Sequence, residues 1–219
     1  MNKILALLIM TTAATFAADG RFLNLIAGFS APMGDYALQS DDPNAGFAKV
    51  GFAGGLEYDW FIKRGNLAWS TAFHYIANDF ESNTFSRGVS LDLYESGTYS
   101  AYTLVTGLKW QKNLAESVEV FALGQAGFGS IKGPFLSGYP STGSGGLIEF
   151  QMNSSSGFAF AVGAGMLLNR QTYLAVRYID AGKATFSKKI SAAGNPEVNW
   201  STPVSMLLIT VGYAIAFDE

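Results

Sequence analysis

Hydrophobic and polar residues alternate along most of this chain with a period of two. In the stretch TVGYAIAF, Thr210 to Phe217, every second residue is large and apolar, and the residues between them are small. Such alternation is typical of β-strands with two unlike faces, because successive side chains point to opposite sides. No stretch shows the 3.6-residue period of an amphipathic helix, so the sequence predicts an all-β fold. The predicted strands are residues 21–30, 47–61, 66–77, 98–111, 117–130, 157–169, 171–180 and 204–217.

The predicted connections alternate between long loops and short turns. Long loops follow the first, third, fifth and seventh strands, and short turns such as KRGN and RQ follow the others. Outer-membrane barrels have this asymmetry, with short periplasmic turns and long extracellular loops. Propeller blades are the alternative for regularly spaced turns, but here each interval holds two strands rather than four and no motif repeats. The sequence therefore predicts an eight-stranded antiparallel up-and-down transmembrane β-barrel.

Residue size predicts which face of each strand meets which environment. On the second strand, Val50, Phe52 and Leu56 share one face, and Gly51 and Ala53 lie on the other. A soluble barrel needs charged residues along its outside, and neither face supplies them. A narrow lumen accepts small side chains, and lipid accepts a bulky outer face. The bulky face is therefore predicted to meet lipid, although some large residues of the first and fifth strands would face inward: Phe22, Ile26, Phe121 and Leu123.

Aromatic residues gather near the predicted strand ends, where amphipathic rings favour a membrane interface. One predicted girdle lies near the short turns, and a second lies near the long loops. The first contains Trp60, Trp69, Trp110, Tyr173 and Phe217, and the second contains Tyr75, Tyr99, Phe128, Phe158 and Tyr178.

The N-terminus has the features of a secretory signal peptide. Lys3 precedes the apolar run Ile4 to Met10, and Thr15-Phe16-Ala17 forms a small-residue cleavage site. We therefore expect residues 1–17 to be a signal peptide and residues 18–219 to be the barrel domain. The alternative is an anchor helix, but the apolar run is shorter than the roughly 20 residues that a span needs.

Composition excludes several kinds of partner and site. Charged residues make up only 14% of the chain, against about 25% in a typical soluble domain. The net charge of -3 gives no electrostatic support for nucleic-acid binding. There is no cysteine for a disulfide or a zinc thiolate site.

A set of polar and charged residues shares the inward side of the strands. An unpaired charge in a narrow lumen is costly, so the acids should pair with the two cations. We interpret this set as a hydrogen-bonded plug, and a selective ion path is the alternative. The set contains Glu57, Asp59, Lys109, Glu119, Gln125 and Arg177.

The sequence assigns no catalytic residue, metal ligand or cofactor. His74 is the single histidine, and it is predicted to point inward near the outer rim, with Asp79 and Glu81 close in sequence. A rim histidine is the main argument for a lipid-modifying enzyme. However, the surrounding HYIANDFESN has no serine at the spacing that barrel deacylases show.

The chain resembles the eight-stranded outer-membrane β-barrel superfamily of OmpA-barrel and OmpX-like proteins. Thr210, Gly212, Ile215 and Phe217 are similar to the C-terminal signal that such proteins present to the barrel-assembly machinery. The segment GFSAPMGDYA…AGFAKVGFAGGLEYDW resembles their first hairpin. The resemblance implies an outer-membrane location in a Gram-negative-type bacterium, with the assembly machinery and periplasmic chaperones as transient partners.

The sequence thus predicts a non-enzymatic outer-membrane barrel that contributes to envelope structure or to surface binding through its long loops. The expected lasting partners are outer-membrane lipid and lipopolysaccharide, whose phosphates Lys183, Lys188 and Lys189 could meet. A narrow porin-like channel for small solutes or ions is the first alternative, and a lipid-modifying enzyme is the second. The sequence does not name an extracellular ligand.

Overall fold

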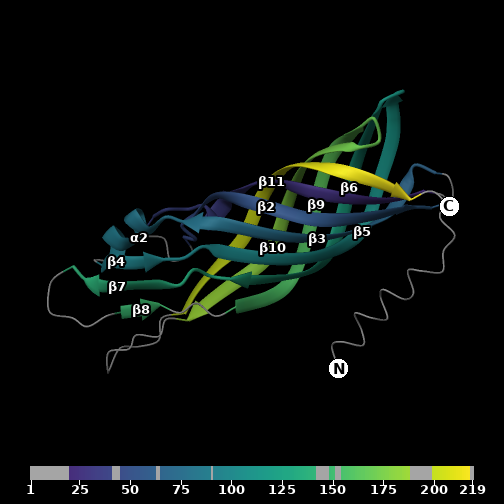
Figure 1. Ribbon diagram of the computed structural model, residues 1–219. Coiled ribbons are helices and arrows are strands. Elements are labelled where there is room, and N and C mark those ends of the chain that lie inside the picture. The colour runs from purple at the N-terminus through teal and green to yellow at the C-terminus, as the bar shows by residue number, and fades with distance from the viewer. Residues whose placement is uncertain are drawn as a thin grey trace.

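The computed structural model describes residues 20–40, 45–62, 65–89, 91–141, 148–150, 154–187 and 199–217. Within these ranges the chain forms a closed antiparallel barrel and a separate three-stranded sheet (Figure 1). The predicted signal peptide lies outside the described residues, as do Lys188 and Lys189. None of the helices in the described ranges has the length and apolar character needed to cross a bilayer.

Eight long strands make the barrel, which confirms the predicted fold and strand number. Most extend two to seven residues beyond the predicted ends on the side of the long loops. The strands are β1 (Arg21–Met33), β2 (Ala48–Phe61), β3 (Leu67–Phe80), β5 (Tyr99–Ala115), β6 (Val118–Lys132), β9 (Ser154–Leu168), β10 (Thr172–Ser187) and β11 (Asn199–Phe217).

Each barrel strand pairs with its neighbours in sequence, in the order β1-β11-β10-β9-β6-β5-β3-β2. The first and last strands close the barrel in an unbroken register, from Arg21 opposite Phe217 to Met33 opposite Ser205. Closure gives the backbone of every barrel strand a partner on both sides, as a spanning sheet requires.

The short connections lie at one end of the barrel and the long ones at the other (Figure 1). The tightest turn joins β9 to β10 with Asn169 and Arg170 at its centre, both in the left-handed region with φ of 51° and 56°. The Gln171 N–H donates to the Leu168 carbonyl at 3.0 Å. Two central residues with positive φ are typical of a type I′ hairpin. The turn is therefore centred one residue earlier than the predicted RQ.

The long connections contain structure that the sequence did not predict. Between β3 and β5 lie α2 (Ser82–Val89) and β4 (Leu91–Ser96). Strand β4 pairs with β7 (Leu136–Pro140), which in turn pairs with β8 (Ile148–Phe150). A short 3-10 helix, η2 (Gly34–Tyr36), follows β1. The eight-residue helix α2 was not predicted from the sequence, whereas the barrel itself consists of strands alone.

The predicted facing of the strands is confirmed by side-chain exposure. On β2, Val50, Phe52 and Leu56 are exposed and Ala53 is buried. On β11, Ile209, Val211, Tyr213 and Phe217 are exposed, whereas Met206, Leu208 and Ala214 are buried. The large residues expected to break the pattern do face inward, since Ile26, Phe121 and Leu123 are buried and Phe22 packs against them.

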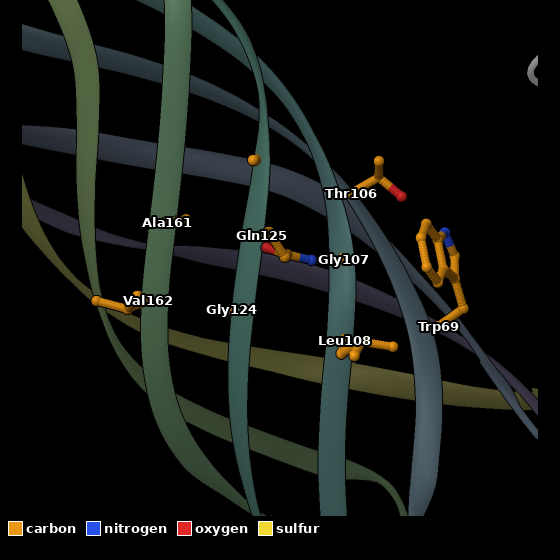
Figure 2. A pocket seen from close by; sticks show the side chains of 9 residues that line it. Trp69, Thr106, Gly107, Leu108, Gly124, Gln125, Ala161 and Val162 are labelled. Atoms are coloured by element: carbon orange, nitrogen blue, oxygen red, sulfur yellow. The ribbon is translucent and has the colours of Figure 1, made fainter.

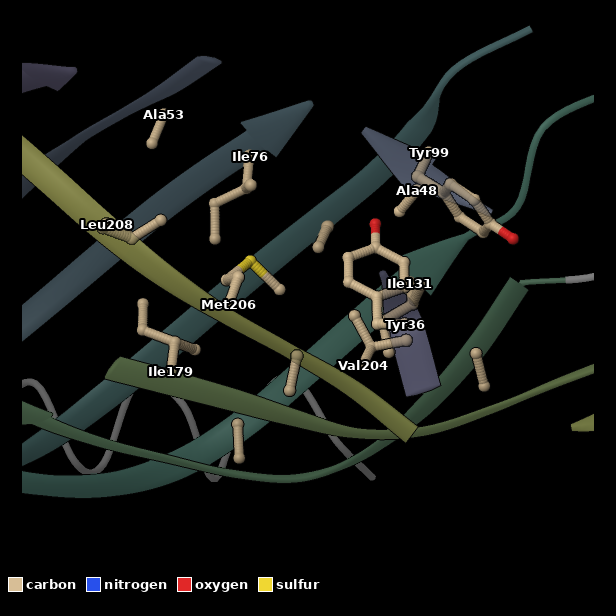
Figure 3. Close-up of a cluster of buried hydrophobic side chains, with 14 of the residues drawn as sticks. Tyr36, Ala48, Ala53, Ile76, Tyr99, Ile131, Ile179, Val204, Met206 and Leu208 are labelled. Carbon is tan, nitrogen blue, oxygen red and sulfur yellow. The ribbon is translucent and has the colours of Figure 1, made fainter. Parts of the chain in front are cut away.

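The half of the barrel interior nearest the long loops is filled with large apolar side chains (Figure 3). Ile76, Ile179, Met206 and Leu208 are each 1% exposed or less. Above them, Tyr36 from the first loop packs edge-on against Tyr99, with ring centroids 5.1 Å apart. The Tyr99 hydroxyl donates to the Gly46 carbonyl at 2.7 Å and ties the first loop into the barrel mouth. The interior is thus bulkier than the small-residue lining that the sequence predicted.

Two residues of the predicted aromatic girdles are misplaced. Tyr99 and Tyr173 are 1% and 0% exposed and lie inside the barrel. Both hydroxyls find hydrogen-bond partners there, which lets a tyrosine be buried at little cost. The other eight predicted girdle residues are at least partly exposed on the outer surface.

Candidate functional site

Alternation along the strands directs a set of charges into the half of the barrel nearest the short turns. On β2, Glu57 and Asp59 occupy inward positions between outward Leu56, Tyr58 and Trp60. Lys109 on β5 and Arg177 on β10 occupy inward positions of their own strands. The barrel closure brings these four charged side chains together, and we call Glu57, Asp59, Lys109 and Arg177 the ion-pair cluster.

The ion-pair cluster is buried and electrically balanced. The Lys109 ammonium lies 3.0 Å from Glu57 Oε1 and 2.6 Å from Asp59 Oδ2. The Arg177 guanidinium pairs with Glu57 Oε2. Each of the four residues is at most 2% exposed. Two carboxylates therefore face two cations, and Glu57 is the acid that both cations share.

Tyr173, Asn24 and Phe121 also contact the cluster, and none of them was predicted as part of it. The Tyr173 hydroxyl donates to Glu57 at 3.2 Å and accepts from Arg177 at 3.0 Å. Asn24 donates to Asp59 at 2.9 Å. The ammonium of Lys109 also sits over the Phe121 ring, 4.2 Å from its centroid. Tyr173 has the same inward parity as Arg177 four residues later, and this parity is the signal that could have found it.

His74 contacts this cluster and does not lie at the outer rim. Its Nε2 lies 2.6 Å from Arg177 Nη1, and its Nδ1 lies 3.0 Å from the Thr103 hydroxyl. His74 is 1% exposed. The predicted inward direction of His74 is therefore confirmed and its predicted place near the outer rim is wrong, and both ring nitrogens already have partners inside the barrel.

The remaining two predicted plug residues lie apart from the ion-pair cluster. Glu119 pairs with Arg170 at 3.0 Å and accepts a hydrogen bond from Gln111 near the short-turn end. Gln125 donates to the Ser70 hydroxyl at 3.0 Å, and Ser70 lies opposite Asp59 in the β2–β3 register. Asp59 Oδ1 and Gln125 Oε1 are buried acceptors without a hydrogen-bond partner in the described part of the chain.

The residues of the predicted assembly signal divide between the two faces of β11. Thr210 and Gly212 lie on the inward face, and the Thr210 side chain is buried. Ile215 and Phe217 lie on the outward face, and Phe217 is exposed. Asp218 and Glu219 lie outside the described residues.

A shallow hollow of about 670 Å³ lies on the outer wall across β3, β5, β6 and β9 (Figure 2). Trp69, Leu108 and Val162 line it over Gly124, where no side chain fills the surface. The hollow is on the opposite side of the wall from the ion-pair cluster. It offers apolar contact and no charged group.

The ion-pair cluster has the chemistry of a structural layer. Its charges cancel, and all its carboxylate oxygens except Asp59 Oδ1 accept hydrogen bonds. Its side chains come from β2, β5 and β10, with Asn24 and His74 adding contacts from β1 and β3. Among the described residues, no group of three or more histidine or acidic residues has a metal-binding arrangement. The arrangement can hold strands together, and it places no reactive group at a surface.

The barrel is similar in overall shape to solved outer-membrane proteins. A major outer membrane protein from Thermus thermophilus matches with a TM-score of 0.52 at 11% sequence identity, over 90% of this chain and 99% of that one. The outer membrane protein OprG from Pseudomonas aeruginosa matches with a TM-score of 0.50 at 12% identity, over 91% and 98% of the two chains. The chain has the fold of the small outer-membrane β-barrels. This barrel matches no family model and no curated protein by sequence.

Proposed function

We propose that the chain is a non-enzymatic outer-membrane β-barrel that spans the bilayer with its closed wall and contributes to envelope structure or surface binding through its long loops. The observation that supports this most is an apolar belt that runs right round the barrel. Every barrel strand contributes at least one large apolar side chain that is 42–74% exposed. Examples in strand order are Phe29, Val50, Phe73, Leu104, Phe128, Val162, Val176 and Val211.

Such a belt fits hydrocarbon and not water as the surrounding solvent. The largest apolar patch of a typical soluble monomer is only about 300–600 Å². In water, an unbroken belt around eight strands would drive aggregation, whereas in a bilayer it is the surface that lipid requires. The closed barrel also leaves no strand edge open to hydrocarbon.

The proposal assigns the partners and the orientation of the barrel. Residues 1–17 would direct export, and β11 would present Thr210, Gly212, Ile215 and Phe217 to the barrel-assembly machinery after chaperone escort. The end that carries α2, β4, β7 and β8 would face outward, and the short turns would face the periplasm. Outer-membrane lipid and lipopolysaccharide would then be the lasting partners.

The filled interior argues against the channel alternative. The apolar cluster around Ile76, Met206 and Leu208 occupies one half of the lumen, and the ion-pair cluster occupies the other. Ions crossing the barrel would have to displace both. The enzyme alternative lacks a basis as well, because His74 is buried and engaged by Arg177.

Planar-bilayer recording tests the proposal. The wild-type protein and the Arg177→Ala variant, each shown to be folded by heat-modified gel mobility, should insert without stable conductance steps. Arg177→Ala removes one of the two cations of the ion-pair cluster. If the cluster alone blocked a conduction path, this variant would show stable conductance steps. A known porin in the same bilayer provides the positive control. Stable openings of the wild type would establish a channel and contradict the closed barrel.

A further inference from the structure

The outward face of β6 and β9 changes character in three regular steps near the long-loop end. Phe128 lies opposite Phe158, Ser130 opposite Ser156, and Lys132 opposite Ser154. All six side chains are exposed. Going toward the long loops, the surface therefore passes from aromatic to hydroxyl to cationic.

A bulge in β10 adds a second lysine to the same surface. Asp180 pairs with Ser205 and Lys183 pairs with Pro203, so β10 holds one extra residue between the two pairs. Before the bulge the odd positions face inward, as the buried Ile179 shows, but after it Ala184 is buried and Lys183 is exposed. Without the extra residue Lys183 would point into the barrel, because a bulge re-aims the side chains that follow it.

Specific residues stabilise this bulge. Gly182 has a φ of 91°, a conformation that side chains other than glycine rarely adopt. The Asp180 carboxylate accepts a hydrogen bond from the Gly182 N–H at 2.8 Å. The Ser155 hydroxyl of β9 donates to the Lys183 carbonyl at 3.1 Å, which fixes the level of Lys183 beside the serines.

Lys132 and Lys183 thus flank β9, because Lys132 pairs with Ser154 and the Lys183 carbonyl accepts the hydroxyl of the next residue, Ser155. Because adjacent strands are about 4.8 Å apart, the two backbones are separated by about 10 Å. Exposed serine hydroxyls lie between the lysines. Within the described ranges, no ion pair includes Lys132 or Lys183, and one oxygen of the Asp180 carboxylate accepts the Gly182 N–H. We call this surface the rim patch, consisting of Ser130, Lys132, Ser154, Ser156 and Lys183.

We propose that the rim patch is a binding site for the phosphate groups of lipopolysaccharide in the outer leaflet, with the acyl chains lying against Phe128 and Phe158. The inference rests on the proposed membrane location. Two cations separated by hydroxyl donors complement a phosphorylated sugar headgroup. The two rings, 74% and 64% exposed directly below, complement its hydrocarbon. A free phosphate ion would use the lysines alone, so the aligned aromatic pair favours a lipid.

The test measures binding of purified lipid A to the full-length folded protein in detergent micelles by native mass spectrometry. Lys132→Gln combined with Lys183→Gln should weaken binding by about 25-fold, since each lysine near an anionic lipid surface contributes about a factor of five. Lys112→Gln is the matched control, because Lys112 is an exposed lysine at the other end of the barrel on β5. This control variant should bind lipid A like the wild type.

Three results would overturn the proposal: equal binding by the double variant, equal binding of dephosphorylated lipid A, or displacement of lipid A by millimolar inorganic phosphate. A different result would overturn the proposed function itself: failure of the wild-type protein to insert into lipid bilayers. Insertion of both variants with unchanged heat-modified mobility would show that the lysine substitutions left the barrel intact.

Discussion

At the scale of single residues, Glu57 is the centre of the barrel interior. It accepts hydrogen bonds from Lys109, Arg177 and Tyr173, although it is fully buried. Taking charges out of water is expensive, and a buried pair recovers that cost only when its geometry and hydrogen bonds are good. Removing one charged side chain of the cluster therefore leaves a buried charge whose desolvation cost is no longer offset by its ion pair.

We predict that Glu57→Gln lowers the free energy of unfolding by about 3–5 kcal/mol, the range for breaking a buried ion pair from one side. Unfolding by urea in detergent micelles, followed by tryptophan fluorescence, measures this change. Arg170→Met provides the contrast, because it breaks the pair with Glu119 but the Arg170 side chain is 71% exposed. Exposed pairs contribute about 0–1 kcal/mol. Equal losses in the two variants would show that the ion-pair cluster is not a structural layer.

The sequence could predict that these side chains point inward, but not which of them meet. Inward direction follows from parity along one strand, so it was accessible for all six predicted plug residues. The contacts depend on how far neighbouring strands are shifted along one another around the closed barrel. Glu57 and Arg177 are 120 residues apart in sequence and lie on strands that are not neighbours in the sheet. No local pattern indicates that they meet, nor that His74 joins them and Glu119 does not.

At the scale of elements, the predicted strand ends fail where the alternation of large and small residues is interrupted. The seventh strand was predicted to end at residue 180, which is where the β10 bulge begins. Beyond the bulge the parity reverses and the strand continues to Ser187. Helix α2 was missed for a different reason, since tertiary contacts of Phe85 with Phe47 and Phe80 hold it in place.

The start of α2 depends on the charge of Glu81. Its carboxylate accepts a hydrogen bond from the Asn83 N–H at 3.2 Å and pairs with the Lys49 ammonium at 3.0 Å. The hydrogen bond from Lys49 is the main cause that lowers the pKa of Glu81 below its usual 4.5, against a smaller opposing effect of burial. A lowered pKa in the folded state means that Glu81 stabilises this element above pH 4.5 and loses that effect as the pH falls through the folded-state value.

We therefore predict that hydrogen-exchange protection of the α2 amides, corrected for intrinsic rates, decreases as the pH is lowered below about 4.5. A lost helix cap costs about 1 kcal/mol, which corresponds to about a fivefold decrease in protection. In Glu81→Gln the same amides should show low protection and little dependence on pH. If protection in the wild type were constant down to about pH 2, Glu81 would not be the group that stabilises the helix start.

At the scale of the whole molecule, the barrel has two unlike layers inside and one apolar belt outside. The apolar layer lies toward the long loops, and toward the short turns the ion-pair cluster lies beside a second apolar cluster that includes Ile26, Phe121 and Leu123. The belt was predictable because it needs only a period of two and a difference in side-chain size. The filling of the lumen was not, because Tyr36 reaches it from a loop and Met206 and Leu208 share a strand face with much smaller residues.

The central claim is that hydrocarbon surrounds the bulky face of the strands. Collision of nitroxide labels with oxygen and with a water-soluble nickel chelate tests it most directly, in protein reconstituted into lipid bilayers. The chain has no cysteine, so single labels can be placed at Val211→Cys and Leu104→Cys, with Leu114→Cys as the exposed apolar control beside a short turn. Labels at Val211 and Leu104 should collide with oxygen and be shielded from the chelate, and the label at Leu114 should meet the chelate. Free access of the chelate to Val211 and Leu104 would contradict a lipid-facing wall.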